Sequence, residues 1–207
     1  MKSGCYTFRD YLTLMEASKQ PPVNPYEKDR KQLQRIEPFV EMLKDKRFEI
    51  GAEIGVWRGE FSESILKRWD GVLLLVDSWK PKEGYEHKKK EHEENKAETV
   101  ARTEKFNRSV IMHMDSKEAS KQISDGRLDF VFIDGDHSYE GVQNDLKLWY
   151  PKIRSGGLFC GHDYLDGFNG ETQFGVKSAV DEFAKKLKMK PFIFGEKKYP
   201  CWAWFKV

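Results

Sequence analysis

The sequence predicts an α/β fold: a mostly parallel, seven-stranded sheet with helices on both faces and an antiparallel hairpin at its C-terminal end. Two observations predict it. Continuously apolar runs alternate with helical segments, as in β–α–β units whose strands are buried on both faces. Residues 191–207 hold two apolar-aromatic runs joined by a charged turn, which is typical of an antiparallel hairpin.

The elements follow in order after a polar N-terminal arm, residues 1–30, whose prolines between positions 21 and 25 interrupt any helix begun before them. Residues 31–207 are expected to form a single domain. Ahead of the C-terminal hairpin, the predicted strands occupy residues 48–56, 71–79, 109–115, 128–134 and 156–164. The predicted helices occupy residues 31–45, 60–69, 116–123, 139–153 and 176–187.

One segment, residues 80–107, interrupts this alternation. It is dense in charges of both signs and rich in helix formers, which indicates a charged helical insertion. Two interpretations are open: a solvated surface helix, or a lid over the site, because the segment directly follows the second predicted strand.

Composition excludes some classes of partner. The 36 Lys and Arg nearly cancel the 34 Asp and Glu, so bulk charge gives no support for a nucleic acid or an anionic membrane as partner. The three cysteines lie far apart, without a C-x-x-C pair, which favours a reducing compartment.

No apolar stretch approaches the ~18 residues of a membrane span, and Arg9 and Asp10 interrupt the apolar stretch that a signal peptide would have near the start, so a cytoplasmic location is expected. The sequence carries no prediction of the oligomeric state.

A loop with Glu53, Gly55 and Gly59 follows the first predicted strand and precedes a helix. Glycines at such a place let backbone N–H groups approach a ligand closely. Asp77 and Asp115 end the next two strands, and an acid at the end of the second strand is placed to bind ribose hydroxyls. The sequence therefore predicts a nucleoside-containing cofactor. The loop lacks G-x-G-x-x-G, and its acid would repel a pyrophosphate, which favours S-adenosylmethionine over a dinucleotide.

With these motifs, E-x-G-x-x-x-G at 53–59, "FIDGDH" at 132–137 and "GGLFCGHDY" at 156–164, the chain resembles the class I S-adenosylmethionine-dependent methyltransferases over roughly residues 48–207. The resemblance implies a Rossmann-like methyltransferase sheet. The cofactor contacts that it implies are Glu53, Gly55 and Gly59 for the amino-acid end, Asp77 for the ribose, and Asp115 with Ser116 for the adenine, with Ser78 and Asp134 adjoining them.

More narrowly, the stretch from "IDGDH" to "GHDY" resembles the metal-dependent O-methyltransferases that modify sugars of macrolides, aminocoumarins and glycans. That resemblance implies a divalent cation, Mg²⁺ or Mn²⁺, on Asp134 and Asp163, with His162 where the branch has another acid, and Asp136 as general base. A histidine in place of an acid removes a negative charge and adds a nitrogen donor, which moves the preference toward Mn²⁺ or another transition ion. The alternative is that only Asp134 and Asp163 bind the ion and that His162 is hydrogen-bonded beside them. His137 competes with Asp136 for the role of base, because an ordinary histidine titrates near neutral pH.

The predicted function is O-methylation of a sugar hydroxyl, with a vicinal diol as acceptor: a cation acidifies the hydroxyl, and a base takes its proton. A deoxyhexose such as rhamnose in a glycan or glycoside is the acceptor that the resemblance implies. One alternative is a metal-independent methyltransferase with His137 as base, acting on a small molecule; a nucleic acid is disfavoured because no clear basic face is visible. Another alternative is a non-catalytic scaffold or partner subunit, for example one fused to a glycosyltransferase in a longer polypeptide.

Overall fold

A computed structural model describes residues 33–81, 86–170 and 172–207. Its main sheet contains β1 (Ile50–Ile54), β2 (Val72–Asp77), β3 (Ser109–His113), β4 (Leu128–Ile133), β5 (Ile153–Gly161), β8 (Phe192–Phe194) and β9 (Cys201–Phe205). The strand order is β3-β2-β1-β4-β5-β9-β8. The first five strands are parallel, whereas β9 runs antiparallel to both β5 and β8. The predicted α/β fold, with its C-terminal hairpin, is confirmed.

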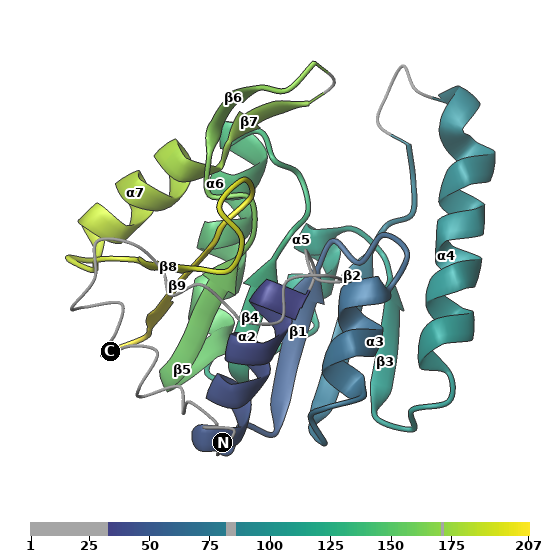
Figure 1. Cartoon of the computed structure of the whole chain (residues 1–207), viewed down its shortest axis with the longest axis horizontal. Coiled ribbons are helices and arrows are strands. Elements are labelled where there is room, and N and C mark those ends of the chain that lie inside the picture. The colour runs from purple at the N-terminus through teal and green to yellow at the C-terminus, as the bar shows by residue number, and fades with distance from the viewer. Residues whose placement is uncertain (1–32, 82–85, 171) are drawn as a thin grey trace, which may run out of the picture.

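Helices cover both faces of this sheet (Figure 1). On one face, α2 (Leu33–Asp45) and α3 (Glu60–Leu66) pack in one hydrophobic cluster. On the other face, α5 (Ser116–Lys121), α6 (Tyr139–Trp149) and α7 (Val176–Lys186) pack in a second cluster. Strand β4 is buried along its whole length, with Phe130 and Phe132 in the first cluster and Val131 and Ile133 in the second. Burial on both faces is why this strand is apolar at successive positions.

The charged insertion contains η1 (Glu86–Lys88) and α4 (Lys89–Thr103), and α4 lies beside α3. Its inner face is polar and buried at Asn95, Thr99 and Thr103. The Thr99 hydroxyl donates to the carbonyl of Trp57 at 3.0 Å, in the loop after β1. The expectation of a solvated helix therefore holds for the outer face only, and the lid remains a prediction.

A second hairpin, β6 (Asp166–Phe168) with β7 (Gln173–Gly175), was absent from the predicted elements. Each strand is only three residues long and β6 is wholly exposed, so neither carries the apolar pattern that reveals a buried strand. The predicted helix 139–153 is α-helical only up to Trp149, where α6 ends. A short 3₁₀ helix, η2 (Tyr150–Lys152), follows it, because proline at position 151 has no N–H to continue the α-helical hydrogen bonding.

The predicted N-terminal arm lies outside the described residues, and the boundary of the domain remains a prediction. Among the helices of the described ranges, none has both the length and the apolar character needed to cross a membrane.

Candidate functional site

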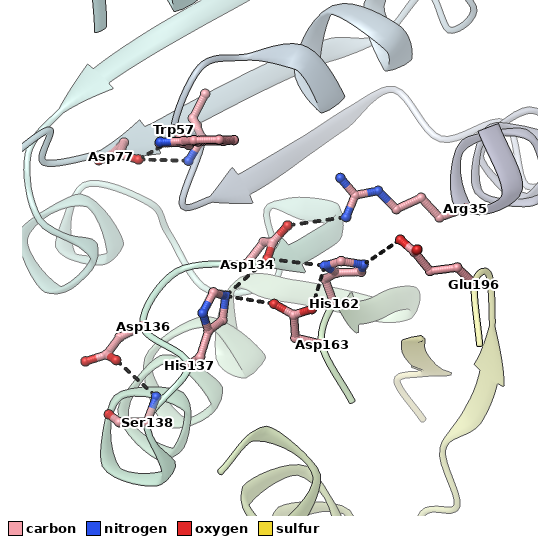
Figure 2. Close-up of polar contacts among 11 residues, drawn as sticks. Arg35, Trp57, Asp77, Asp134, Asp136, His137, Ser138, His162, Asp163 and Glu196 are labelled. Atoms are coloured by element: carbon pink, nitrogen blue, oxygen red, sulfur yellow. Dashed lines mark hydrogen bonds and ion pairs between the residues drawn. The ribbon is translucent and has the colours of Figure 1, made fainter. Parts of the chain in front are cut away.

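The candidate site is formed where β4 and β5 end side by side. These strands are parallel neighbours, so the residues that follow them meet at the same edge of the sheet. Asp134 and His137 follow β4, and His162 and Asp163 follow β5; Figure 2 shows the four side chains converging.

Two carboxylates and one imidazole form the centre of this cluster. Asp134, His162 and Asp163 each offer one ligand atom, and the three atoms lie within 4.8 Å of one another. His162 Nδ1 is 3.1 Å from Asp163 Oδ1 and 3.6 Å from Asp134 Oδ1. Asp163 is buried and has a left-handed backbone with φ of 53°, a conformation that costs energy for a non-glycine residue. This mixed oxygen and nitrogen donor set fits a divalent transition ion such as Mn²⁺.

His137 is a fourth member of the cluster. Its Nε2 lies 3.1 Å from Asp163 Oδ2 and 3.5 Å from Asp134 Oδ1. The imidazole stacks on Phe174 of β7, with ring centroids 5.2 Å apart and an interplanar angle of 19°. The unpredicted hairpin thus holds the histidine ring in place.

Asp136, by contrast, points away from the cluster (Figure 2). Its Oδ1 accepts a hydrogen bond from the backbone N–H of Ser138 at 3.0 Å, where α6 begins. A Cβ placed on Gly141 would come within 2.6 Å of the Asp136 side chain, so this carboxylate lies against the first turn of the helix. Of the two predicted bases, the structure brings only His137 into contact with the predicted metal ligands.

Cationic side chains offset the charge of the carboxylates. Burial opposes ionisation of Asp134, but contacts with His137, His162 and Arg35 outweigh it and hold the pKa of this carboxyl well below its usual range. Burial alone would lower the pKa of His162, yet Asp134 and Glu196 raise it to about 9. The pKa of His137 is also raised, because the carboxylates outweigh its burial. The site is therefore one that attracts positive charge.

Two members of this charge network were not predicted. Arg35 of α2 has Nη1 3.6 Å from Asp134 Oδ2, and Glu196 of the β8–β9 turn has Oε1 3.6 Å from His162 Nε2. Arg35 precedes the buried Phe39 by four residues and so shares its helix face, a signal that sequence reasoning can use. No such local signal marks Glu196, whose place depends on the pairing of distant strands.

The glycine loop after β1 packs directly on the cluster. Gly55 has φ of 89°, and a Cβ there would lie 2.2 Å from the carbonyl oxygen of Asp134. Asp77 Oδ2 accepts hydrogen bonds from the N–H groups of Val56 at 2.9 Å and Trp57 at 3.0 Å, as Figure 2 shows in part. The predicted ribose ligand therefore also fixes the shape of the loop. Gly59, with φ of 73°, ends that loop as the N-cap of α3.

The predicted adenine contacts lie at the end of β3 and have structural partners. Asp115 caps α5 by accepting from the N–H of Glu118 at 2.8 Å. The Ser116 hydroxyl donates to Asp145 and accepts from Trp149 Nε1 at 2.8 Å. The adenine role of both residues stays a prediction. Ser78, the other predicted contact, follows β2, and its carbonyl lies 3.0 Å from His113 Nε2.

Glu53 is buried within β1, where Ser62 of α3 donates a hydrogen bond to its carboxyl at 2.6 Å. Burial, aided by the negative charge of Asp134, raises the pKa of Glu53 to about 8 although the Ser62 hydrogen bond lowers it. Near neutral pH the carboxyl is mostly protonated. It therefore repels a pyrophosphate less than the fixed negative charge assumed from the sequence.

We expect Glu53→Gln to stabilise the fold at neutral pH. The folded-state pKa is above the ordinary 4.5, so the folded chain binds this proton more tightly and stability falls as pH rises from about 4.5 toward 8. Glutamine keeps the shape but cannot ionise. The free energy of unfolding of the variant should exceed that of the wild type by at most about 3 kcal/mol at pH 7, and by progressively less toward pH 5. Denaturant unfolding across this range measures it; a difference independent of pH would contradict the prediction.

Comparisons with known proteins identify the family of this domain. The family model described as "Methyltransferase domain" matches residues 52–164, more than half of the chain. A candidate caffeoyl-CoA O-methyltransferase of Staphylococcus aureus superposes with a TM-score of 0.63 at 12% identity, covering 98% of this chain and 93% of that one. An O-methyltransferase of Bacillus cereus, solved in complex with SAH, superposes with a TM-score of 0.58 at 13% identity, covering 97% and 90%.

A curated relative matches over a short segment. An uncharacterized protein of Acanthamoeba polyphaga mimivirus is 46% identical over 39 residues, and this segment is 19% of the present chain and 18% of the viral protein. The solved structures share the fold at low sequence identity, whereas the family model covers the glycine loop and both aspartates of the cluster. The chain belongs to the methyltransferase domain family.

Proposed function

We propose that this protein is an S-adenosylmethionine-dependent O-methyltransferase that methylates a sugar hydroxyl with the help of a divalent cation. One observation carries the proposal: Asp134, His162 and Asp163 converge beside the glycine loop. A metal site and a cofactor loop in contact would place an acceptor oxygen next to a methyl donor.

Two findings support S-adenosylmethionine as the methyl donor: the match to the methyltransferase family, and the likeness to the Bacillus cereus structure, which was solved in complex with SAH. In this chain, the glycine loop and Asp77 lie at the carboxyl ends of β1 and β2, where ligands of such sheets bind. Part of the Asp77 carboxylate already accepts hydrogen bonds from the loop. Asp77 Oδ1 also accepts from the backbone N–H of Trp79 at 2.7 Å, so one lone pair on Oδ1 is left to accept a ribose hydroxyl.

Asp134, Asp163 and His162 would hold the cation, since they supply two negative charges and one nitrogen. When bound, a divalent cation lowers the pKa of a hydroxyl on it and so makes a sugar oxygen a better nucleophile. His137 is the residue placed to accept the hydroxyl proton, because its ring reaches both carboxylates. Its stacking on Phe174 restricts the plane of the imidazole ring.

The acceptor that suits this chemistry is a vicinal diol. Two neighbouring oxygens bind a divalent cation better than one and fix which hydroxyl faces the methyl donor. The choice of a deoxyhexose such as rhamnose, in a glycan or glycoside, depends on the resemblance of residues 133–164 to the sugar-modifying branch.

Chelation tests the proposal directly. Protein exhaustively treated with EDTA, then supplied with methyl-labelled S-adenosylmethionine and a panel of glycosides, is expected to transfer no label. Adding Mn²⁺ or Mg²⁺ should restore transfer, while calorimetric binding of S-adenosylmethionine should be equal before and after chelation. Full transfer by the chelated protein would exclude the metal mechanism.

One observation favours a second candidate. The contact between His137 Nε2 and Asp163 Oδ2 at 3.1 Å resembles a histidine base oriented by a carboxylate, which needs no metal. A metal-independent methyltransferase acting on a small hydroxylated molecule would use this pair, and it is the candidate left if chelated protein remains active.

A further inference from the structure

We propose that Glu196 is a positioning residue that makes His162 a metal ligand through its Nδ1 nitrogen. This inference depends on the metal site of the proposed function. Glu196 belongs to the turn between β8 and β9, outside the motifs that indicate the site in the sequence.

The topology of the C-terminal hairpin brings Glu196 to the site. Strand β9 runs antiparallel to β5, with Trp202 opposite Gly161, so the turn that precedes β9 lies at the carboxyl end of β5. The N–H of Tyr164 donates to the carbonyl of Pro200 at 2.9 Å, which ties the turn to the segment after Asp163. On its other side the turn meets α2, since a Cβ on Gly195 would lie 3.3 Å from the Arg35 side chain.

The two nitrogens of the His162 ring face different partners (Figure 2). Nδ1 faces the two aspartates, at 3.1 Å from Asp163 and 3.6 Å from Asp134. Nε2 faces Glu196 at 3.6 Å, is buried, and makes no hydrogen bond to any of the described residues. Glu196 is itself largely buried, with its side chain 18% exposed.

This arrangement decides which nitrogen can bind a metal. A cation that binds the His162 ring displaces one proton from it, and the nitrogen that loses its proton becomes the ligand. A carboxylate beside Nε2 keeps the proton there and leaves the Nδ1 lone pair directed at Asp134 and Asp163. Because Glu196 and the aspartates lie on opposite sides of the ring, Glu196 would not bind the cation itself and would affect cation binding only by orienting His162.

Binding of Mn²⁺ to the full chain, followed by electron paramagnetic resonance, tests the inference. Glu196→Ala is expected to bind Mn²⁺ about 10- to 100-fold more weakly than the wild type, the usual loss when the carboxylate behind a ligating histidine is removed. Glu196→Gln keeps an oxygen that accepts the Nε2 proton and should stay within about threefold of the wild type. Lys197→Ala changes an exposed neighbour in the same turn and is the matched control.

A spectroscopic readout separates positioning from a general loss of structure. In protein labelled with ¹⁵N-histidine and saturated with Mg²⁺, His162 should carry its proton on Nε2 in the wild type and in Glu196→Gln. Glu196→Ala should lose this fixed tautomer, while its thermal unfolding midpoint reports whether it folds.

The outcomes separate this inference from the proposed function. Mn²⁺ binding by Glu196→Ala as tight as by the wild type, or a loss in Glu196→Gln equal to that in Glu196→Ala, would overturn the positioning role and leave the metal site standing. Absence of Mn²⁺ binding by the wild type would overturn both. If Glu196→Ala does not fold, Glu196→Gln with the ¹⁵N spectra decides: a proton on Nδ1 of His162 contradicts the inference.

Discussion

Asp163→Ala is expected to lower the rate of methyl transfer by about 10³-fold or more, while S-adenosylmethionine still binds. Asp163 is buried between His137 and His162 and supplies one of the three converging ligand atoms. Its removal takes away a negative charge from the proposed metal site. Stabilisation of the developing charge by a metal is worth several kcal/mol, and each 1.36 kcal/mol corresponds to about tenfold in rate. Transfer rates at saturating Mn²⁺, with calorimetry for cofactor binding, measure both parts of this result.

Two further variants sharpen this prediction. Asp163→Asn keeps an oxygen donor without the charge and should lose less activity than the alanine variant. Asp125→Ala removes an exposed carboxylate, paired with Lys152 at 2.8 Å on the surface, and should leave transfer unchanged. Wild-type rates in Asp163→Ala would remove this residue from the mechanism.

His137→Gln is expected to lower the transfer rate by about 10²- to 10⁴-fold, the usual contribution of a general base, whereas Asp136→Asn should have a small effect. The reason is placement: His137 contacts both cluster aspartates, and Asp136 points toward the start of α6. Asparagine at position 136 keeps an oxygen for the Ser138 N–H, so this variant should fold normally.

The pH profile supplies the second readout. Contact with the aspartates raises the pKa of His137, against the effect of its burial, so the ring is protonated over a wider range of pH than usual. A base must first lose its proton, and the wild-type rate should therefore rise with pH. This rise should be absent from His137→Gln and kept in Asp136→Asn; the opposite pattern would make Asp136 the base.

The central strands were predictable because they are buried on both faces and so are apolar at successive positions, as residues 130–133 of β4 illustrate. The ligand set Asp134, His162 and Asp163 was expected from the family resemblance, and the structure explains why these residues meet: β4 and β5 are parallel neighbours that end at one edge of the sheet. The hairpin β6–β7 was not predicted because its strands are short and mostly exposed, although its Phe174 stacks on His137.

The sequence alone could not predict where side chains point or which of them are ionised. Asp136 and His137 are adjacent, and only the way the chain enters α6 decides that one caps the helix while the other joins the cluster. Glu196 comes from the β8–β9 turn, far from the motifs in sequence, whereas the four-residue spacing of Arg35 to Phe39 was a usable signal that the prediction missed. Glu53 was recognised as a motif residue, but its raised pKa depends on how deeply the fold buries it.

The central claim is that Asp134, His162 and Asp163 hold a divalent cation beside the methyl donor. A crystal of the protein grown with Mn²⁺ and S-adenosylhomocysteine, measured at a wavelength where manganese scatters anomalously, tests it most directly. We expect one anomalous peak bonded to both aspartates and to Nδ1 of His162, with the cofactor on the glycine loop. Bound cofactor with no peak at the cluster, and His137 still between the two aspartates, would contradict the claim.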